Sequence, residues 1–274
     1  PSHATLLTGL LPSEHGLRDN AGFRLDDSVV TLAERLRSRD YQTAAFVSAY
    51  VLDSAWGLDR GFQIYHDPFD LSDVDQRAVF DSETRQDGDN RAAFGEVELS
   101  SAEVINSAIG WWEHTEGDEK RFGWVHLYDP HAPWIEHPEF PGDPYRSEVS
   151  HVDQLLRRLV RTVGEDTLII LTSDHGEGLW EHGEREHGIT LTRSVTRVPL
   201  IVRPPYALSG LATVPDLPSA DPPVRRPEGI DEELELGPVP NRPRAARIVE
   251  TPVSGLDIAA TIADFAAVEP TING

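Results

Sequence analysis

An aspartate and a histidine stand side by side directly after a short apolar segment. Residues 167–172 read TLIILT, and Ser173, Asp174 and His175 follow them. A carboxylate and an imidazole at the end of a strand offer one hard and one borderline metal ligand. Such a pair can also cap a turn, but His182 and His187 follow in the same glycine-containing stretch. Solvated loops rarely concentrate so many imidazoles, so we expect a metal or catalytic site here.

A second group of histidines lies in residues 125–133, which read VHLYDPHAP. This segment also runs from an apolar stretch into a turn framed by prolines. His131 lies just past the expected strand, where an imidazole can meet an oxygen of a ligand. His126 lies within the strand and is interpreted as a core histidine. For Asp129, capping of the turn and a functional role are both open.

The opening of the chain, residues 1–20, reads PSHATLLTGLLPSEHGLRDN. Its residue types predict a short helix that begins at Pro1 and Ser2 and ends between residues 9 and 12. The N-terminal end of a helix favours anions. On residue chemistry alone, however, His3 and Asn20 carry no specific signal, and an ordinary capped helix with a polar loop explains the segment.

Helical and strand patterns alternate along the chain. Apolar residues at helical spacing predict helices from Ser28, around residues 104–112, at 152–163, and after a capping box at Ser254 and Asp257. Short apolar runs predict buried strands at residues 41–48, 122–128, 167–172 and 198–202. This order predicts an α/β domain with a mainly parallel sheet sandwiched between helices.

In such sheets, sites lie beyond the carboxyl ends of the strands. That rule points to residues 129–131, to residues 174–187 and to whatever precedes Pro1. Residues 66–99 are acidic and polar, and residues 204–247 are rich in proline. Both segments are interpreted as surface excursions, although the second could also shape a substrate entrance.

The composition limits the classes of function. The 274 residues hold 24 Lys and Arg against 47 Asp and Glu, a formal net charge of −23, which excludes a nucleic-acid binder with a basic surface. Lys120 is the single lysine, so we weigh a halophilic origin against a GC-rich genome that replaces lysine by arginine. No cysteine is present, and no apolar run approaches the length of a membrane span. The localisation stays open: cytoplasmic for a halophile, otherwise cytoplasmic or exported.

The three segments together resemble the sulfatase family of the alkaline phosphatase superfamily. Residues 1–20 are similar to the segment that follows the nucleophile in these enzymes. Residues 173–188, SDHGEGLWEHGEREHG, resemble the second metal-ligand segment, and residues 126–134, HLYDPHAPW, the segment with the substrate histidine. Residues 194–205 and 251–266 resemble downstream blocks of the family, so the similarity covers most of the chain. The resemblance implies an alkaline phosphatase-like fold.

The resemblance also implies roles for individual residues. Asp174 and His175 match the metal-ligand pair. Asn20 matches an asparagine that holds an anionic substrate oxygen in phosphodiesterase relatives, and His131 matches the histidine that contacts the substrate. His187 falls where a lysine or histidine assists the bound oxyanion or the leaving group.

Two departures from the family pattern concern the start of the chain. The nucleophile is expected two residues before Pro1 and further carboxylate ligands earlier still, so residues 1–274 are expected to be a truncated catalytic domain, inactive alone. His3 stands where formylglycine sulfatases have an arginine of their modification signature. This departure argues against a formylglycine aldehyde as the nucleophile and favours an unmodified Ser or Thr. His3 and His131 are expected to contact the substrate.

The implied chemistry is attack on sulfur by a metal-activated oxygen nucleophile, followed by hydrolysis of a covalent sulfo-enzyme. We therefore expect a metal-dependent sulfatase-like hydrolase of sulfate esters, a sulfuric ester hydrolase. Its partner would be an anionic ester, and Ca, Mg, Mn and Zn all fit as the divalent cofactor. One alternative is a phosphodiesterase, phosphonate hydrolase or phosphoglycerol-type transferase of the same superfamily. The other is a non-catalytic binding domain that retains the fold.

Overall fold

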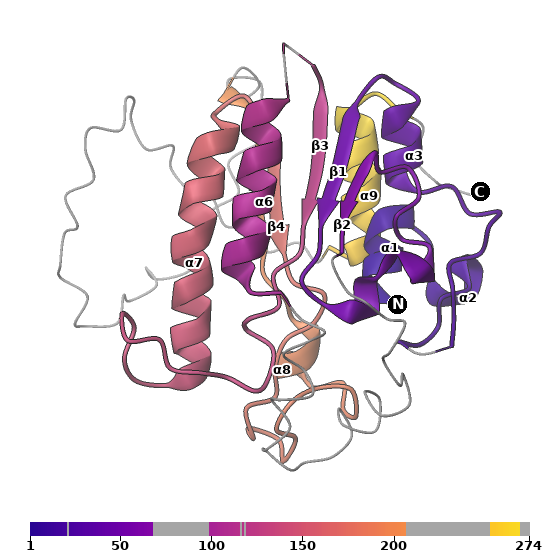
Figure 1. Cartoon of the computed structure of the whole chain (residues 1–274). Helices are drawn as coiled ribbons and strands as arrows, with labels where there is room; N and C mark the ends of the chain where they lie inside the picture. Colours follow the sequence, from indigo (N-terminus) through magenta and orange to yellow (C-terminus); the bar gives the residue numbers. More distant parts are fainter. Residues whose placement is uncertain (21, 68–98, 116, 118, 207–252, 269–274) are drawn as a thin grey trace, which may run out of the picture.

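A three-stranded parallel sheet lies between two layers of helices (Figure 1). The computed structural model describes residues 1–20, 22–67, 99–115, 117, 119–206 and 253–268. The central strand is β1 (Gln42–Phe46), with β2 (Ile64–His66) and β3 (Arg121–Val125) on its two sides. Both neighbours run parallel to it, and Ala44 pairs with Ile64 of β2 and Gly123 of β3. The α/β class expected from the sequence is confirmed.

Successive residues of β1 face opposite helical layers, as the alternation of a strand requires. Ala44 and Phe46 pack with buried residues of α6 (Ser101–His114). Ala45 belongs to a second cluster that includes Ala4 of α1 (Ser2–Thr8) and Ala33 of α3 (Leu32–Arg37). In Figure 1, α7 (Pro144–Val163) lies beside α6, and α9 (Gly255–Phe265) lies on the side of α1 and α3. The sheet is therefore covered on both faces.

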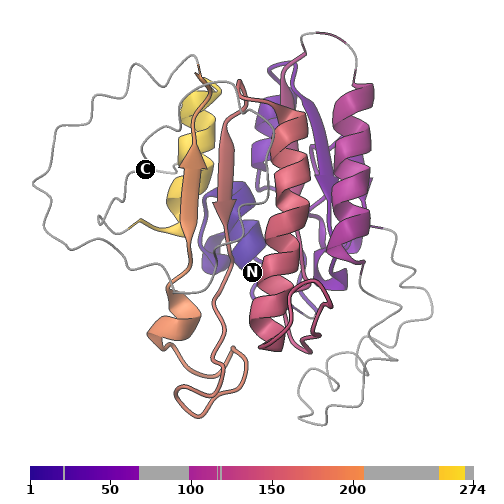
Figure 2. The ribbon, with the colours of Figure 1, turned by 90° about the vertical axis from the view of Figure 1, so that its left-hand side faces the viewer.

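A separate antiparallel pair stands next to this sheet. It consists of β4 (Ile169–Thr172) and β5 (Leu200–Arg203), which lie side by side in opposite directions in Figure 2. The strand expected at residues 198–202 exists, but it runs antiparallel to its neighbour. The chain turns back through α8 (Arg193–Thr196) at the edge where β4 ends, without the crossover that a parallel pair needs. Among the described strands, no hydrogen-bonded ladder joins β3 to β4.

Several boundaries differ from the sequence prediction. The helix expected from Ser28 begins at Leu32, because Thr31 caps it: the Thr31 hydroxyl accepts from the Glu34 N–H and the Glu34 carboxylate accepts from the Thr31 N–H. The strand expected at residues 122–128 ends at residue 125. The short β2 was missed by the sequence pattern. The cap of α9 by Ser254 is confirmed.

The remaining described elements are short. They are α2 (Pro12–His15), η1 (Tyr50–Leu52) and η2 (Ser54–Trp56). The excursions expected at residues 66–99 and 204–247 lie almost entirely outside the described residues. None of the described helices has the length and apolar character needed to cross a membrane.

Candidate active site

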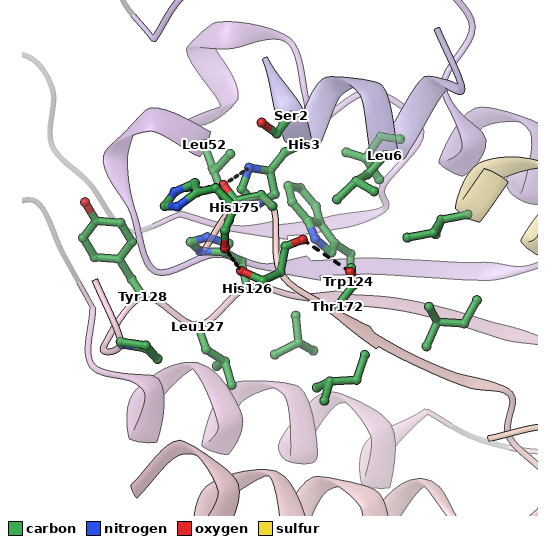
Figure 3. Close-up of a pocket in the computed structure, with 18 of the residues that line it drawn as sticks. Ser2, His3, Leu6, Leu52, Trp124, His126, Leu127, Tyr128, Thr172 and His175 are labelled. Carbon is green, nitrogen blue, oxygen red and sulfur yellow. Dashed lines mark hydrogen bonds and ion pairs between the residues drawn. The ribbon is translucent and has the colours of Figure 1, made fainter. Parts of the chain in front are cut away.

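The segments that carry histidines meet where β1, β3 and β4 end, at the lower edge of the molecule in Figure 1. A cavity of about 1910 Å³ reaches this edge and extends between β3 and β4. Figure 3 shows its wall, to which α1, β3, β4 and the segments that follow these two strands contribute the labelled side chains Ser2, His3, Trp124, His126, Thr172 and His175. Residues far apart in the sequence therefore share one cavity.

Asp174 lies between two imidazoles. Its Oδ2 is 3.6 Å from Nδ1 of His3 and 3.6 Å from Nε2 of His175. Burial alone would raise the pKa of the Asp174 carboxyl, but the neighbouring His3 and His175 outweigh it and lower the pKa to about 2. The carboxylate is therefore ionised at neutral pH, as a metal ligand must be.

His175 is oriented by the turn that carries it. Its Nδ1 lies 2.9 Å from the carbonyl oxygen of Gly176, which can only accept, so Nδ1 holds the proton. In the neutral ring, Nε2 then keeps its lone pair, which is how a protein prepares a metal-ligating histidine. Asp174 and His175 thus fit a divalent cation by donor chemistry. Within the described part of the chain, no three metal-ligating side chains converge, so the pair supplies only part of a coordination shell.

His131, His175 and His187 form a compact cluster. The ring of His187 stacks on His175 with centroids 3.7 Å apart, and His131 meets His187 edge to face at 5.1 Å. Burial lowers the pKa of His131 to about 4, so this ring is neutral in the free protein. Its Nδ1 donates to the carbonyl oxygen of Ala132 at 2.6 Å, which again leaves Nε2 as an acceptor.

His187 differs from its neighbours because it has a carboxylate partner. Its Nδ1 is 3.3 Å from Oε1 of Glu177, a side chain that is almost fully buried. Burial lowers the pKa of His187, but the hydrogen bond and charge of Glu177 outweigh it, and the pKa lies above its usual value. His187 therefore holds a positive charge more readily than His131, with a proton available on Nε2.

His126 also belongs to the cavity wall, although the sequence suggested a plain core position. The hydroxyl of the fully buried Ser48 donates to the backbone oxygen of His126 at 2.9 Å and lies 3.0 Å from its Nδ1. One hydroxyl has one proton, so Nδ1 of His126 donates to Ser48. Burial, with the neighbouring His3 ring at 4.8 Å, lowers the pKa of His126 to about 3.

The remaining sequence candidates have different surroundings. Asn20 lines the same cavity, but it is exposed, and the histidine cluster forms without contact from its side chain. His182 is exposed as well. Asp129 accepts hydrogen bonds from the N–H, at 2.8 Å, and the hydroxyl of Ser101, so it holds the first turn of α6. Sequence reasoning missed Glu177 as the partner of His187, although it belongs to the same motif.

Solved structures resemble this chain over most of its length. Ps i-CgsB in complex with k-i-k-neocarrahexaose has a TM-score of 0.63 and 16% identity over 98% of this chain and 61% of that one. The phosphonate monoester hydrolase of Agrobacterium radiobacter has a TM-score of 0.62 and 19% identity over 98% of this chain and 64% of that one. The TM-scores show a shared fold, and the chain spans less than two thirds of either protein.

A third solved structure, BT4656 in complex with its substrate D-glucosamine-2-N,6-O-disulfate, has a TM-score of 0.55 and 17% identity over 75% of this chain and 61% of that one. A comparison with curated proteins gave no match. The family model described as Sulfatase matches residues 1–268. Since this match spans nearly the whole sequence, the chain belongs to the sulfatase family.

Proposed function

We propose that this chain is the greater part of the catalytic domain of a metal-dependent hydrolase that cleaves sulfate esters through a covalent intermediate. The observation that carries the proposal is the cavity that Asp174 and His175 share with His131 and His187. One end of this group offers metal ligands and the other offers a proton. Hydrolysis of an anionic ester needs both, because negative charge must be neutralised and a leaving oxygen must be protonated.

Asp174 and His175 would hold the divalent cation. When bound, such a cation neutralises charge on the nucleophile and on the oxygens of the ester. The chain has a formal net charge of −23, so an anionic ester is repelled at long range and needs this local cation. As the family resemblance implies, the oxygen nucleophile is expected upstream of Pro1.

His187 is the proposed proton donor. Its Nδ1 is occupied by Glu177, so the proton on Nε2 is the one that can leave. As the bond between sulfur and the ester oxygen breaks, that oxygen would take the proton, and His187 becomes neutral. A water molecule that later attacks the sulfo-enzyme would return a proton to His187 as sulfate is released.

His131, His3 and Asn20 are proposed to position the ester. The neutral His131 offers a lone pair at Nε2 in the free protein, and a bound anion beside it would favour its protonated, donating form. The ionised Asp174, 3.6 Å from Nδ1 of His3, favours the protonated form of that ring, although burial outweighs it and lowers the pKa of His3 below its usual value. Asn20 would hold an oxygen of the ester from the open side of the cavity.

A phosphoryl-transfer enzyme of the same superfamily is the second candidate, in the form of a phosphodiesterase, phosphonate hydrolase or phosphoglycerol-type transferase. It is favoured by His3, which occupies the position of the arginine in formylglycine sulfatases and lies 3.6 Å from Asp174. Turnover of nitrophenyl sulfate and of bis-nitrophenyl phosphate by the full-length protein with added Mn, Zn, Ca or Mg decides between the two. Activity on the phosphate ester alone contradicts the sulfatase proposal, and no activity on either ester favours the non-catalytic binding domain.

The metal ligand can be tested directly. Asp174→Asn removes the negative charge from the proposed ligand, so we expect metal affinity to fall by about a hundredfold or more and kcat/KM to fall with it. Calorimetric metal titration and steady-state assays measure the two effects. Asp129→Asn is the matched control, since it changes a carboxylate that caps α6 and should lower stability while metal affinity stays the same. Equal metal affinity in Asp174→Asn and the wild type would contradict the assignment.

A further inference from the structure

A cationic and aromatic group lies beside the histidine cluster. It consists of Trp134, Tyr145 and Arg185, and we call it the Arg185 group. The Arg185 guanidinium lies over the indole of Trp134, 5.7 Å from its centroid. The ring of Tyr145 meets the same indole edge to face at 5.7 Å. Arg185 and Tyr145 both line the large cavity.

Backbone contacts hold the Arg185 group in place. The indole Nε1 of Trp134 donates to the carbonyl oxygen of Pro130 at 3.0 Å, next to His131. The carbonyl oxygen of Arg185 accepts from the N–H of Leu179 at 3.0 Å, within the turn that also carries His187. The guanidinium is therefore tied to the same two segments that supply the histidines, which favours a fixed position relative to them.

The contacts of the site follow one another in a chain. His3 contacts Asp174, which contacts His175, whose ring stacks on His187. His187 also meets His131 edge to face at 5.1 Å, and the neighbouring Pro130 accepts the hydrogen bond from Trp134 of the Arg185 group. The proposed metal ligands thus lie at one end and the Arg185 group at the other. An ester whose reacting centre lies between the metal and His187 would direct its leaving group toward Arg185.

The positive charge of the Arg185 guanidinium is available to bind an anionic ligand. Among the described residues, its ion pair is with Glu186 at 3.7 Å, which is beyond hydrogen-bond distance. Other lysines and arginines of the cavity wall lie away from the histidines: Lys120 and Arg121 at the start of β3, Arg203 at the end of β5, and Arg157 on α7, where it pairs with Asp153 at 2.9 Å. In a strongly acidic chain, a guanidinium at this place favours anions.

We propose that Arg185 is a specificity-determining residue that binds a second anionic group on the leaving group of the ester. This inference rests on the proposed hydrolase function and narrows its substrates to esters with at least two anionic groups. Trp134 and Tyr145 act as positioning residues, because they touch the guanidinium or each other and hold it beside the cavity. A guanidinium matches a carboxylate or a sulfate through two parallel hydrogen bonds, which a lysine cannot reproduce.

The test compares two aryl esters that differ only by a carboxylate on the leaving group. For the full-length protein, we expect Arg185→Gln to lower kcat/KM for the carboxylated ester about tenfold, mainly through KM. The uncharged ester should change less than twofold, and Arg185→Lys should keep part of the preference. Arg157→Gln, which removes a cation from another part of the cavity wall, is the matched control and should leave the preference intact. Equal losses for both esters, or no loss for either, would overturn the proposal.

Product binding separates this inference from the proposed function. Calorimetry with the carboxylated and uncharged phenols measures the leaving-group site without any turnover. If the wild type hydrolyses neither ester but binds the carboxylated phenol more tightly, and Arg185→Gln loses that difference, the anion site stands while the hydrolase proposal fails. If turnover is normal but both phenols bind equally to the wild type, the hydrolase proposal stands and the Arg185 proposal is wrong. Trp134→Leu should weaken binding of the carboxylated phenol selectively, as expected of a positioning residue.

Discussion

His126 makes the stability of the fold depend on pH, because its ring stays neutral in the folded protein. Burial and the neighbouring His3 lower its pKa to about 3, whereas an unfolded histidine titrates near 6.5. Above the unfolded value, neither state binds the proton, so the group has no effect. As pH falls below it, only the unfolded chain takes up the proton, and stability is lost until the pH reaches the folded value.

We therefore expect the free energy of unfolding of the metal-free protein to fall between pH 7 and pH 5, with about 2 kcal/mol of the loss due to His126. His126→Asn cannot take up this proton, so the variant should show a shallower pH dependence. Urea unfolding of both proteins at several pH values measures the difference. Parallel curves for the variant and the wild type would contradict the neutral state of this ring.

The sequence could predict the residues that follow strand ends, and it did so for Asp174, His175, His131 and His187. Their place at the carboxyl edge follows from local patterns alone. The states of the rings do not, because each depends on a partner that folding supplies. Ser48, 78 residues before His126, fixes the tautomer of that ring, and no local pattern indicates it.

At the scale of elements, the turn after β4 requires glycine at position 176, because it has no room for a side chain there. Gly176 donates to the carbonyl oxygen of Val195 at 2.6 Å, and a Cβ at Gly176 would overlap the carbonyl oxygen of Ser194 in α8. Gly176→Ala should therefore push α8 from the turn that carries Asp174 and His175. We expect a loss of about 2 kcal/mol or more of stability together with weaker metal binding.

Gly110→Ala provides the matched control for this prediction. Gly110 lies inside α6 with an ordinary helical backbone, and apart from its chain neighbours and the nearby backbone of α6, a Cβ there would meet no atom within 4 Å. Since alanine favours a helix over glycine, this variant should gain about 0.5–1 kcal/mol. Thermal unfolding and metal titration of the two variants test the contrast. A Gly176→Ala protein with unchanged metal affinity would show that the turn tolerates a side chain.

The order of helices and strands was predictable because α6, α7, β1, β3 and β4 carry clear apolar patterns. Two features of the sheet were not. The strand β2 has three residues, too few for a periodic signal, and pairing with β1 determines it. The direction of β5 depends on where the chain returns through α8, which the apolar run at residues 198–202 does not encode.

The whole molecule carries its charge almost entirely as carboxylates and arginines. A formal net charge of −23 on 274 residues causes self-repulsion in the folded state, which salt screens. For a halophilic protein, we expect the midpoint of thermal unfolding to rise by roughly 10 °C or more between about 0.1 and 2 M KCl. Sucrose is a suitable control, since it stabilises without screening charge. A midpoint that is independent of KCl would favour the GC-rich explanation of the arginine content.

Self-repulsion also affects the edge of β3 that faces β4, because no hydrogen-bonded ladder joins these two described strands. The N–H of His126 bonds to Phe46 of β1, so alternation turns the N–H groups of Gly123 and Val125 away from β1 and toward the cavity. Open strand edges of this kind recruit strands from other molecules. Self-repulsion opposes such pairing in dilute buffer, and salt weakens it. We therefore expect the salt that stabilises each molecule also to favour association between copies of the chain.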